Sequence, residues 1–339
     1  MALVHRRFTT HGGTERWIVG FARWLVAHGH APTVLCAEVR PDLRDEPGVR
    51  FVPLTAWRPA RMASLWWSAR RALASRSWDI VMGFGRTPGH DVFRAGGGSH
   101  AEALRRMRPW SRFLRPSDAL ELAMDRHAVR CARIVLANSR FAAAGLVRDY
   151  GAPRVEVVYN GVDPAVFRPD PSARREVRAA LGTSQHAPVA VFLGTGFRRK
   201  GLDRAIAALP AGVQLWVVGA DRPWRAPPQV RFLGASRVPE RFLQAADLLL
   251  LPTRYDPFAN ACLEALACGI PFVTTSCNGA SEIAPHPWMV ADDPAGWRAG
   301  VETALAGDWR ERCLAVASRF PPSHGYARAL GLLQEASGR

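Results

Sequence analysis

The sequence predicts an α/β protein composed of two Rossmann-like domains that face each other across a cleft. Short apolar runs alternate with amphipathic helical stretches, and this alternation begins again after a proline-rich segment at residues 163–172. Apolar strands that alternate with helices are typical of parallel sheets covered on both faces. A length of 339 residues suits two domains. Ligands of such domains are expected at the carboxyl ends of the strands.

In the first half, apolar runs of strand length alternate with longer amphipathic stretches. Strands are expected at residues 2–5, 33–36, 51–54, 80–84, 134–137 and 155–158. Helices are expected at residues 15–27, 61–74 and 119–131, with basic helical segments after a loop at residues 85–100. The pair Asn160-Gly161 predicts a turn, and the three prolines of residues 163–172 predict a linker.

The second half repeats the pattern. Strands are expected at residues 189–194, 214–218, 230–233, 248–252 and 271–275. Helices are expected at residues 201–209, 239–246 and 261–268, with further helices near the end of the chain. We therefore expect an amino-terminal domain over residues 1–165, a second domain over residues 166–322, and a final helix within residues 323–339 that packs back on the first domain.

Charge is distributed unevenly along the chain, whose formal net charge is +16. Residues 1–150 contain 24 arginines and 12 acidic residues and so carry +12, whereas residues 151–339 carry only +4. Such an excess predicts an anionic partner for the first half, which could be nucleic acid, a phosphorylated glycan or an acidic membrane surface. With 48% hydrophobic residues, the chain also contains enough apolar side chains to exclude global disorder.

Further features of the composition indicate a cytosolic protein. No apolar run approaches the ~18–20 residues needed to span a bilayer, and no export signal opens the sequence. The cysteines show neither CxxC pairs nor zinc-ligand spacing with histidines, so buried thiols are expected and no metal site is predicted. The six cysteines are Cys36, Cys131, Cys262, Cys268, Cys277 and Cys313.

The first motif, Thr-His-Gly-Gly-Thr-Glu at residues 10–15, lies between the first strand and the first helix. Its two glycines allow the backbone to approach a ligand, and the start of a helix offers free N–H groups to an anion. The motif lacks the GxGxxG pattern of dinucleotide-binding proteins. An ordinary strand–helix turn therefore remains an alternative.

The second motif, residues 194–201, follows the first strand of the second domain and contains Arg198, Arg199 and Lys200. Cations at the end of a strand and the start of a helix are well placed to stabilise a diphosphate. A solvated basic turn is the ordinary alternative. Lys200 is, however, the single lysine among 45 basic residues, and this singularity favours phosphate binding.

The third motif, residues 255–271, places Asp256 in a loop and Glu264 eight residues later on a helix. Carboxylates at these places can accept hydrogen bonds from sugar hydroxyls, one on a hexose and one on a ribose. Acidic residues at this spacing are common on solvated helix faces. The context is more specific, because a strand precedes the motif and a small-residue helix leads through Gly-Ile-Pro into another strand.

Together these motifs resemble those of the retaining glycosyltransferases of family 4, which have the GT-B fold of two Rossmann-like domains. The similar stretches are residues 12–16, 160–163, 199–201 and 256–271. Within that family, residues 83–93 and 197–201 are most similar to the lipopolysaccharide core glucosyltransferases that act on the first heptose.

The resemblance implies roles for the matched residues. Arg199 and Lys200 would bind the diphosphate of the donor, Glu264 its ribose hydroxyls, and Asp256 the transferred sugar. Further donor contacts are implied for Gly13, Thr14, Arg198, Phe258, Ala259 and Asn260. The implied donor is UDP-glucose, used as a substrate with no cofactor, and the implied reaction retains the anomeric configuration and needs no metal, because cations and helix dipoles neutralise the departing diphosphate.

Two departures from the family pattern concern the same site. The family usually has glutamate where Asp256 stands, so the shorter carboxylate is expected to alter sugar preference or reach. It often has arginine where Thr195 stands, so Arg198 or Arg199 must supply that charge.

On the acceptor side, Asp91, Ser99 and His100 flank the three glycines of residues 96–98, where the wall of the cleft in the first domain is expected. His100 and Asp91 are therefore candidate catalytic residues. A histidine at this place could bind a sugar hydroxyl or serve a structural role, and the sequence leaves both readings open.

Two segments combine arginines with aromatic side chains, as suits an anionic bilayer surface. Residues 57–78 contain four tryptophans and five arginines, and residues 103–115 contain five arginines with Trp110 and Phe113. We therefore expect peripheral attachment to the inner face of the cytoplasmic membrane, where lipid-linked acceptors emerge. The alternative is that the tryptophans pack inward and the arginines are merely solvated.

Other functional classes explain less of the sequence. A UDP-sugar 2-epimerase would share the fold but would not need a basic, aromatic first domain. A nucleic-acid-binding protein would account for the charge, yet no helix-turn-helix, RRM or zinc-finger pattern is present, and no nucleic-acid partner is expected. An inactive sugar-binding relative would not need the basic and acidic residues of the second and third motifs.

Overall fold

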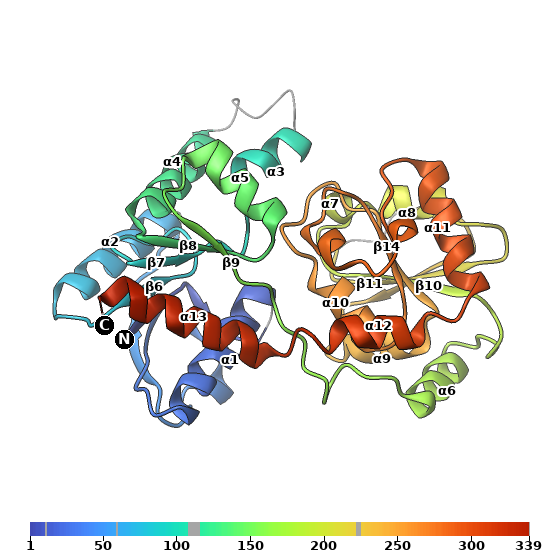
Figure 1. The fold of residues 1–339 in the computed structure, drawn as a ribbon, viewed down its shortest axis with the longest axis horizontal. Helices are drawn as coiled ribbons and strands as arrows, with labels where there is room; N and C mark the ends of the chain where they lie inside the picture. The colour runs from blue at the N-terminus through green and yellow to red at the C-terminus, as the bar shows by residue number, and fades with distance from the viewer. Residues whose placement is uncertain (11, 59, 108–115, 222–224, 339) are drawn as a thin grey trace. The chain divides into compact units, whose positions relative to one another are not determined.

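The structure is a computed structural model that describes residues 1–339 except residues 11, 59, 108–115, 222–224 and 339 (Figure 1). Its internal contacts divide the chain into unit 1, which comprises Met1–Asn160 and Pro322–Arg339, and unit 2, which comprises Gly161–Pro321. Each unit contains its own parallel sheet flanked by helices. The prediction of two Rossmann-like halves is therefore confirmed.

Unit 1 is built on a seven-stranded sheet with the order β5-β3-β1-β6-β7-β8-β9, and all neighbouring strands are parallel. The order reverses direction between β1 and β6, which is the switch point of a doubly wound sheet. Its strands are β1 Ala2–Val4, β3 Thr33–Cys36, β5 Arg50–Pro53, β6 Val81–Gly83, β7 Val92–Arg94, β8 Ile134–Ala137 and β9 Val155–Val157. A separate pair joins β2 Arg7–Phe8 to β4 Glu38–Val39.

The helices of unit 1 include one from the end of the chain. They are α1 Gly13–Ala27, α2 Arg61–Ala74, α3 His100–Met107, α4 Pro116–Cys131, α5 Arg140–Tyr150 and α13 Pro322–Ser337, with a 3-10 turn at Pro41–Leu43. Leu332 and Leu333 of α13 join the same buried cluster as Ile18 of α1. The rings of Tyr326 and Trp17 meet at 5.3 Å, so the last helix completes the core of the first unit.

Besides the short pair of β2 and β4, one strand and one helix of unit 1 were not predicted from the sequence. Strand β7 lies inside the expected loop at residues 85–100, and helix α5 follows β8 where no helix was predicted. The three residues of β7 are buried, and such a short strand carries too few residues to show a pattern. Helix α5 begins at a clear cap, since Ser139 accepts a hydrogen bond from the amide of Ala142.

Unit 2 contains a five-stranded parallel sheet with the order β12-β11-β10-β13-β14. Its strands are β10 Val189–Leu193, β11 Gln214–Val218, β12 Val230–Gly234, β13 Leu248–Leu251 and β14 Phe272–Thr274. Its helices are α6 Pro171–Ala180, α7 Phe197–Lys200, α8 Leu202–Ala208, α9 Pro239–Ala245, α10 Asn260–Ala267, α11 Pro294–Ala306 and α12 Arg310–Ala317, with 3-10 turns at Gly279–Ile283 and Pro287–Met289. The switch point of this sheet lies between β10 and β13.

The segment expected to be a linker is partly helical. Helix α6 begins at Pro171, and the side chain of Asp170 accepts hydrogen bonds from the amides of Ser172 and Ala173. Proline suits the first position of a helix, because its fixed φ is helical and its missing N–H would have no partner there. The third proline of the segment therefore starts an element rather than extending the linker.

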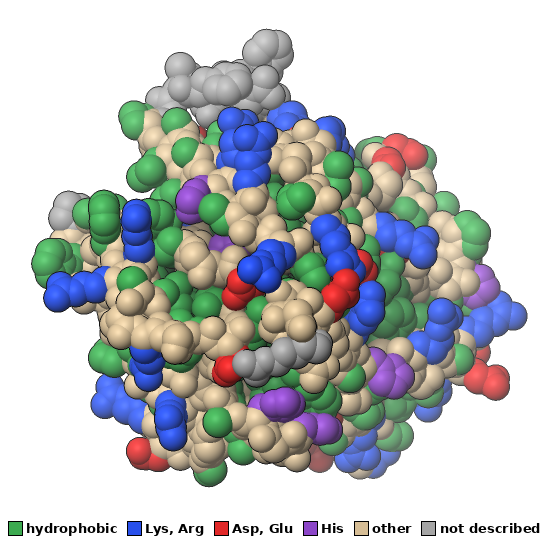
Figure 2. Space-filling model, turned by 60° about the vertical axis from the view of Figure 1, so that its left-hand side comes forward, with side chains coloured by type: hydrophobic (Ala, Val, Ile, Leu, Met, Phe, Trp, Pro, Cys, Tyr) green, Lys and Arg blue, Asp and Glu red, His purple; other side chains and the backbone are tan. Residues whose placement is uncertain are grey.

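The composition predicted a chain without membrane-spanning segments, a basic surface and buried thiols. Among the described residues, no helix is both long and apolar enough to span a membrane. Figure 2 shows arginine and lysine side chains spread over the face in view, with fewer acidic ones among them.

All six cysteines are free thiols, of which Cys131 is exposed, Cys277 is half-buried and the other four are buried. The expectation of buried thiols therefore holds for four of the six.

Candidate active site

The second and third motifs of the sequence lie on either side of the switch point of unit 2. The turn containing Arg199 and Lys200 follows β10, and the loop containing Asp256 follows β13, its neighbour in the sheet. Both strands run in the same direction, so both segments lie at the carboxyl edge of the sheet. The fold thus brings together residues that are 56 positions apart in the chain.

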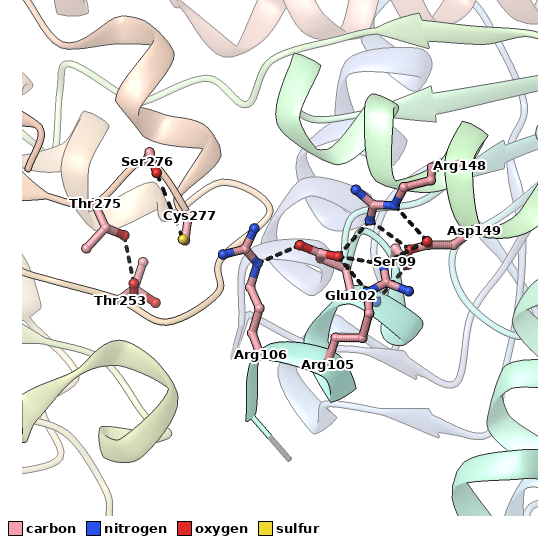
Figure 3. A network of polar contacts seen from close by, with 10 residues as sticks. All are labelled: Ser99, Glu102, Arg105, Arg106, Arg148, Asp149, Thr253, Thr275, Ser276 and Cys277. Atoms are coloured by element: carbon pink, nitrogen blue, oxygen red, sulfur yellow. Dashed lines mark hydrogen bonds and ion pairs between the residues drawn. The ribbon is translucent and has the colours of Figure 1, made fainter. Parts of the chain in front are cut away.

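Lys200 is held by a turn that is fixed on both sides. The carboxylate of Asp221 accepts hydrogen bonds from the amides of Gly196 (2.9 Å) and Phe197 (2.6 Å), which caps the start of α7. At the other end, the hydroxyl of Thr253 donates to the carbonyl of Arg199 at 2.9 Å. The hydroxyl of Thr275 in turn donates to the carbonyl of Thr253 (Figure 3).

The stem of Lys200 passes directly over Gly194. A Cβ atom at Gly194 would lie 2.6 Å from Cε of Lys200, and the φ of this glycine is +130°. Any other residue would be strained and would also displace the lysine stem. The side chain is thereby directed inward, and Lys200 is only 8% exposed.

Both Arg199 and Lys200 interact with the carboxylate of Asp256. Nη1 of Arg199 donates to Oδ2 of Asp256 at 2.8 Å and to the carbonyl of Tyr255 at 3.0 Å. Nζ of Lys200 lies 3.5 Å from the same Oδ2. The backbone of Asp256 is fixed as well, because its N–H donates to the carbonyl of Cys277 and its carbonyl accepts from Gly279.

The charge state of Asp256 follows from this arrangement. Burial acts to raise the pKa of the carboxyl, but Lys200 and Arg199 outweigh burial and hold the pKa below its ordinary value. Asp256 is therefore ionised at neutral pH. The cluster of Arg199, Lys200 and Asp256 carries one net positive charge, which an anionic ligand would neutralise.

The amides of the following loop are less available than the sequence suggested. The N–H of Phe258 donates to Oδ1 of Asp256 at 3.3 Å, and the N–H of Ala259 donates to Oδ1 of Asn278 at 3.1 Å. Both amides already have acceptors within the unit, and their contact with the donor stays a prediction. Asn260 is the first residue of α10 and is half-buried.

The two remaining predicted residues of unit 2, Glu264 and Arg198, differ in burial. Glu264 is buried on α10, a helix that follows the Asp256 loop. Arg198, by contrast, is exposed, and its backbone carbonyl accepts a hydrogen bond from Arg254. Of the two arginines that could replace the missing cation at Thr195, Arg199 is the one that pairs with the buried Asp256.

Asn278 is a residue of this site that the sequence analysis missed. It is fully buried, and Oδ1 accepts from the amides of Ala259 and Ala280, while Nδ2 donates to Thr274 Oγ1. It therefore ties the loop after β13 to the segment after β14. An Asn-Gly pair after a predicted strand is an ordinary turn signal, and nothing in the sequence points from it to Ala259.

In unit 1, the predicted residues Gly13 and Thr14 form the first turn of α1. His11 of the same motif lies outside the described residues. His100 begins α3, and Nε2 of His100 lies 3.3 Å from Oε2 of Glu121. The same glutamate contacts Arg86, which also binds Asp125 through two hydrogen bonds. His100 therefore belongs to a cluster of ionisable groups.

The position of Asp91 contradicts its predicted role. Asp91 directly precedes β7, and its Oδ2 accepts a hydrogen bond from the amide of Val81 at the start of β6. His100 follows the other end of β7. Because the strands are parallel, the two residues lie at opposite edges of the sheet, and Asp91 lies at the amino edge, where it links strand starts. The sequence pattern placed no strand between them, which is why they were expected together.

Ser99 and the basic segment near it form an internal network (Figure 3). Glu102 binds Arg105, Arg106 and Arg148, whose nitrogens lie within 2.6 Å of its carboxylate. Asp149 accepts from Arg105, from Arg148 and from the hydroxyl of Ser99. Three arginines and two carboxylates therefore form one network inside unit 1, which keeps one net positive charge. Residues 108–115, the rest of the predicted basic segment, lie outside the described residues.

Within the described ranges, no group of three or more His, Cys, Asp or Glu residues is arranged to hold a metal ion.

Two doubly wound units in succession, the second with cations and a buried carboxylate at its switch point, are typical of glycosyltransferases with the GT-B fold. Residues 11–166 match the model of Glycosyltransferase Family 4, and residues 187–306 match that of Glycosyl transferases group 1. The chain therefore belongs to the family 4 type of glycosyltransferases, as the resemblance of its motifs predicted.

Relatives and solved structures agree with this assignment. The chain is 29% identical to a probable transglycosylase of Burkholderia thailandensis over 87% of this chain and 83% of that protein. It is 25% identical to the lipopolysaccharide glucosyltransferase WaaG of Escherichia coli over 80% of this chain and 79% of that one. The crystal structure of WaaG superposes with a TM-score of 0.84 at 21% identity, covering 98% of this chain and 99% of that chain. The Anabaena protein HepE, solved in complex with UDP and glucose, superposes with a TM-score of 0.74 at 17% identity and with the same coverage.

Proposed function

We propose that the protein transfers glucose from UDP-glucose, with retention of the anomeric configuration, to a lipid-linked glycan such as the lipopolysaccharide core. The observation that carries this proposal is the cluster at the switch point of unit 2, in which Lys200 and Asp256 are buried and Arg199 is partly exposed. The name of the relative WaaG supports the acceptor, and the UDP and glucose bound by HepE support the donor.

In this proposal each member of the cluster has one task. Arg199 and Lys200 bind the diphosphate, because charge-assisted hydrogen bonds to phosphate are strong where water is excluded. Asp256 accepts hydrogen bonds from the transferred sugar, and Glu264 accepts them from the ribose. Gly13 and Thr14 of unit 1, with the exposed Arg198 of unit 2, supply further contacts to the donor.

The transfer step forms one bond and breaks another. The oxygen of an acceptor hydroxyl bonds to the anomeric carbon as the bond between that carbon and the diphosphate oxygen breaks. Attack from the face that the diphosphate leaves preserves the configuration, and the hydroxyl proton passes to the departing phosphate oxygen. Lys200 and Arg199 stabilise the negative charge that develops on the diphosphate, a task that a divalent metal performs in other transferases.

We expect UDP to raise the melting temperature of the protein, and the variant Glu264→Gln to reduce UDP affinity about tenfold through the loss of charged hydrogen bonds. Glu302→Gln is the matched control, since Glu302 is exposed on α11 of the same unit, and should bind UDP within twofold of the wild type. The measurement is isothermal calorimetry with UDP, supported by thermal shift. Equal UDP affinity in the two variants would remove Glu264 from the site.

We further propose that unit 1 attaches to an anionic membrane surface at the cytoplasmic face, where a lipid-linked acceptor would be within reach. Trp57 is 72% exposed and Trp67 is 64% exposed. Arg70 lies over the rings of Trp66 and Trp67, with its Cζ 5.6 Å and 5.7 Å from their centroids. Trp78, in contrast, packs against the buried cluster beneath α2. Of the four tryptophans in residues 57–78, Trp57 and Trp67 are therefore the two that are exposed to a membrane.

Sedimentation with liposomes tests the attachment. The protein should sediment with vesicles that contain anionic lipid and much less with purely zwitterionic vesicles, because exposed cations near a charged surface contribute ~1 kcal/mol each. Trp57→Ser combined with Trp67→Ser should reduce the bound fraction severalfold. Leu120→Ser removes a half-exposed apolar side chain elsewhere in unit 1 and should have no effect. Binding that is indifferent to the tryptophans would refute this surface as the attachment site.

A further inference from the structure

The two cations that are proposed to bind the donor diphosphate share one carboxylate oxygen. Oδ2 of Asp256 lies 2.8 Å from Nη1 of Arg199 and 3.5 Å from Nζ of Lys200. The other oxygen, Oδ1, accepts a long hydrogen bond of 3.3 Å from the amide of Phe258. Asp256 is only 6% exposed, so water screens its charge little. The carboxylate is therefore the internal counterion of both cations.

The cations remain accessible to a second anion. Within the described residues, no other carboxylate forms an ion pair with Arg199 or Lys200. The two side-chain hydrogen bonds of Arg199, to Asp256 and to the carbonyl of Tyr255, both come from Nη1. The side chain of Arg199 is 36% exposed, so its other N–H groups can donate to a ligand outside. A diphosphate can thus bind these cations while Asp256 stays in place behind them.

A diphosphate in this position meets the negative charge of Asp256 through the cations that they share. Lys200 and Arg199 hold the pKa of this carboxyl below its ordinary value, so the group is charged at neutral pH. The cluster then carries +1, whereas the two cations alone would carry +2. In a site that excludes water, one charge a few ångströms away changes the binding of an anion strongly. Asp256 therefore weakens the binding of a bare diphosphate.

The sugar of the donor compensates for this cost in the proposed function. Its hydroxyls donate hydrogen bonds to the carboxylate of Asp256, and hydrogen bonds to a charged acceptor are stronger than neutral ones. Oδ1 has room for such a bond, since the amide of Phe258 is its one long partner among the described residues. An intact UDP-sugar satisfies the carboxylate, whereas UDP leaves it facing the phosphates without a hydroxyl.

We propose that Asp256 discriminates between the donor and the UDP product by competing with the diphosphate for the charge of Arg199 and Lys200. The site then holds a UDP-sugar and releases the UDP that remains after transfer, which limits inhibition by the product. This inference rests on the proposed function, because that function supplies the UDP-sugar and the contact of its sugar with Asp256.

Calorimetry with UDP and with UDP-glucose tests the inference. Asp256→Asn keeps the shape of the side chain but removes its charge, and should bind UDP at least fivefold more tightly than the wild type does. The preference for UDP-glucose over UDP should fall by at least the same factor. Asp256→Glu keeps the charge and should not gain UDP affinity. Damage to the site would weaken both ligands, so it cannot imitate this gain.

Glu302→Gln is the matched control, because it removes an exposed carboxylate of the same unit and should leave UDP affinity within twofold. The comparison is repeated in an Arg199→Gln background, in which asparagine at position 256 leaves one cation rather than two without a carboxylate. The gain should appear there too, so the test stays decisive if Asp256→Asn alone does not fold.

A gain in UDP affinity below fivefold, in a variant that thermal unfolding shows to be folded, would overturn the inference. Failure of the proposed function would look different, because the wild type would then bind neither UDP nor UDP-glucose.

Discussion

Replacement of Lys200 by alanine is expected to lower kcat/KM for glycosyl transfer by about 10²- to 10³-fold, the usual cost of removing a group that stabilises developing charge. Nζ of Lys200 lies beside Asp256 in a buried position, so its charge is little screened by water. In the proposed reaction the diphosphate gains negative charge as the sugar departs. Loss of the ammonium therefore destabilises the transition state more than the bound donor, and kcat should fall more than donor affinity.

The measurement is initial-rate kinetics with a UDP-sugar and an acceptor extract, accompanied by thermal unfolding to show that the variant is folded. Arg175→Ala is the matched control, because Arg175 is an exposed cation on α6 of the same unit. It should leave kcat/KM within about twofold. Turnover of Lys200→Ala within threefold of the wild type, in a folded protein, would exclude the lysine from the reaction.

Elements with strong local signals were predicted almost to the residue. Helix α2 and strands β8 and β11 have the predicted bounds, because each is a clean amphipathic or apolar run. Strand β7 was missed, since three residues between glycine-rich loops show no periodicity. Helix α6 was missed because its opening proline was assigned to a linker, although proline is favoured at that position.

In the candidate site, too, features that depend on local sequence were predicted and features that depend on strand order were not. The lone lysine and its strand–turn–helix context indicated an anion site, and the structure places that turn at the switch point. Its pairing with Asp256 depends on the order of the strands in the sheet, which periodicity does not specify. Asn278 was missed for a related reason, since an Asn-Gly pair carries only a turn signal until the fold shows that its side chain is buried and bonded to Ala259.

Replacement of Asp256 by asparagine is expected to lower the free energy of unfolding of the protein by about 3 kcal/mol at pH 7, because it leaves the buried Lys200 and the partly exposed Arg199 without their carboxylate. Oδ2 of Asp256 lies 2.8 Å from Nη1 of Arg199 and 3.5 Å from Nζ of Lys200. An amide at this position keeps the shape but cannot neutralise either charge. The same change should reduce transfer activity, since the transferred sugar would lose a charged acceptor of hydrogen bonds.

The pH dependence of this loss identifies its cause. The pKa of Asp256 is lowered in the folded protein although burial acts to raise it, and the cations Lys200 and Arg199 are the reason. A lowered folded pKa contributes stability above the ordinary carboxyl pKa of about 4, and this contribution is lost as the pH falls through the folded value. The difference in free energy of unfolding between wild type and Asp256→Asn should therefore be constant from pH 8 to about pH 5 and shrink below pH 4.

Urea unfolding across this pH range provides the measurement. Glu311→Gln is the control, because Glu311 is an exposed carboxylate on α12 of the same unit and its replacement should change the free energy of unfolding by less than about 0.5 kcal/mol. A loss in Asp256→Asn that does not diminish in acid would point to packing or hydrogen bonding at position 256 rather than charge. In that case Arg199 and Lys200 would not depend on the carboxylate, and the electrostatic basis of the cluster would be wrong.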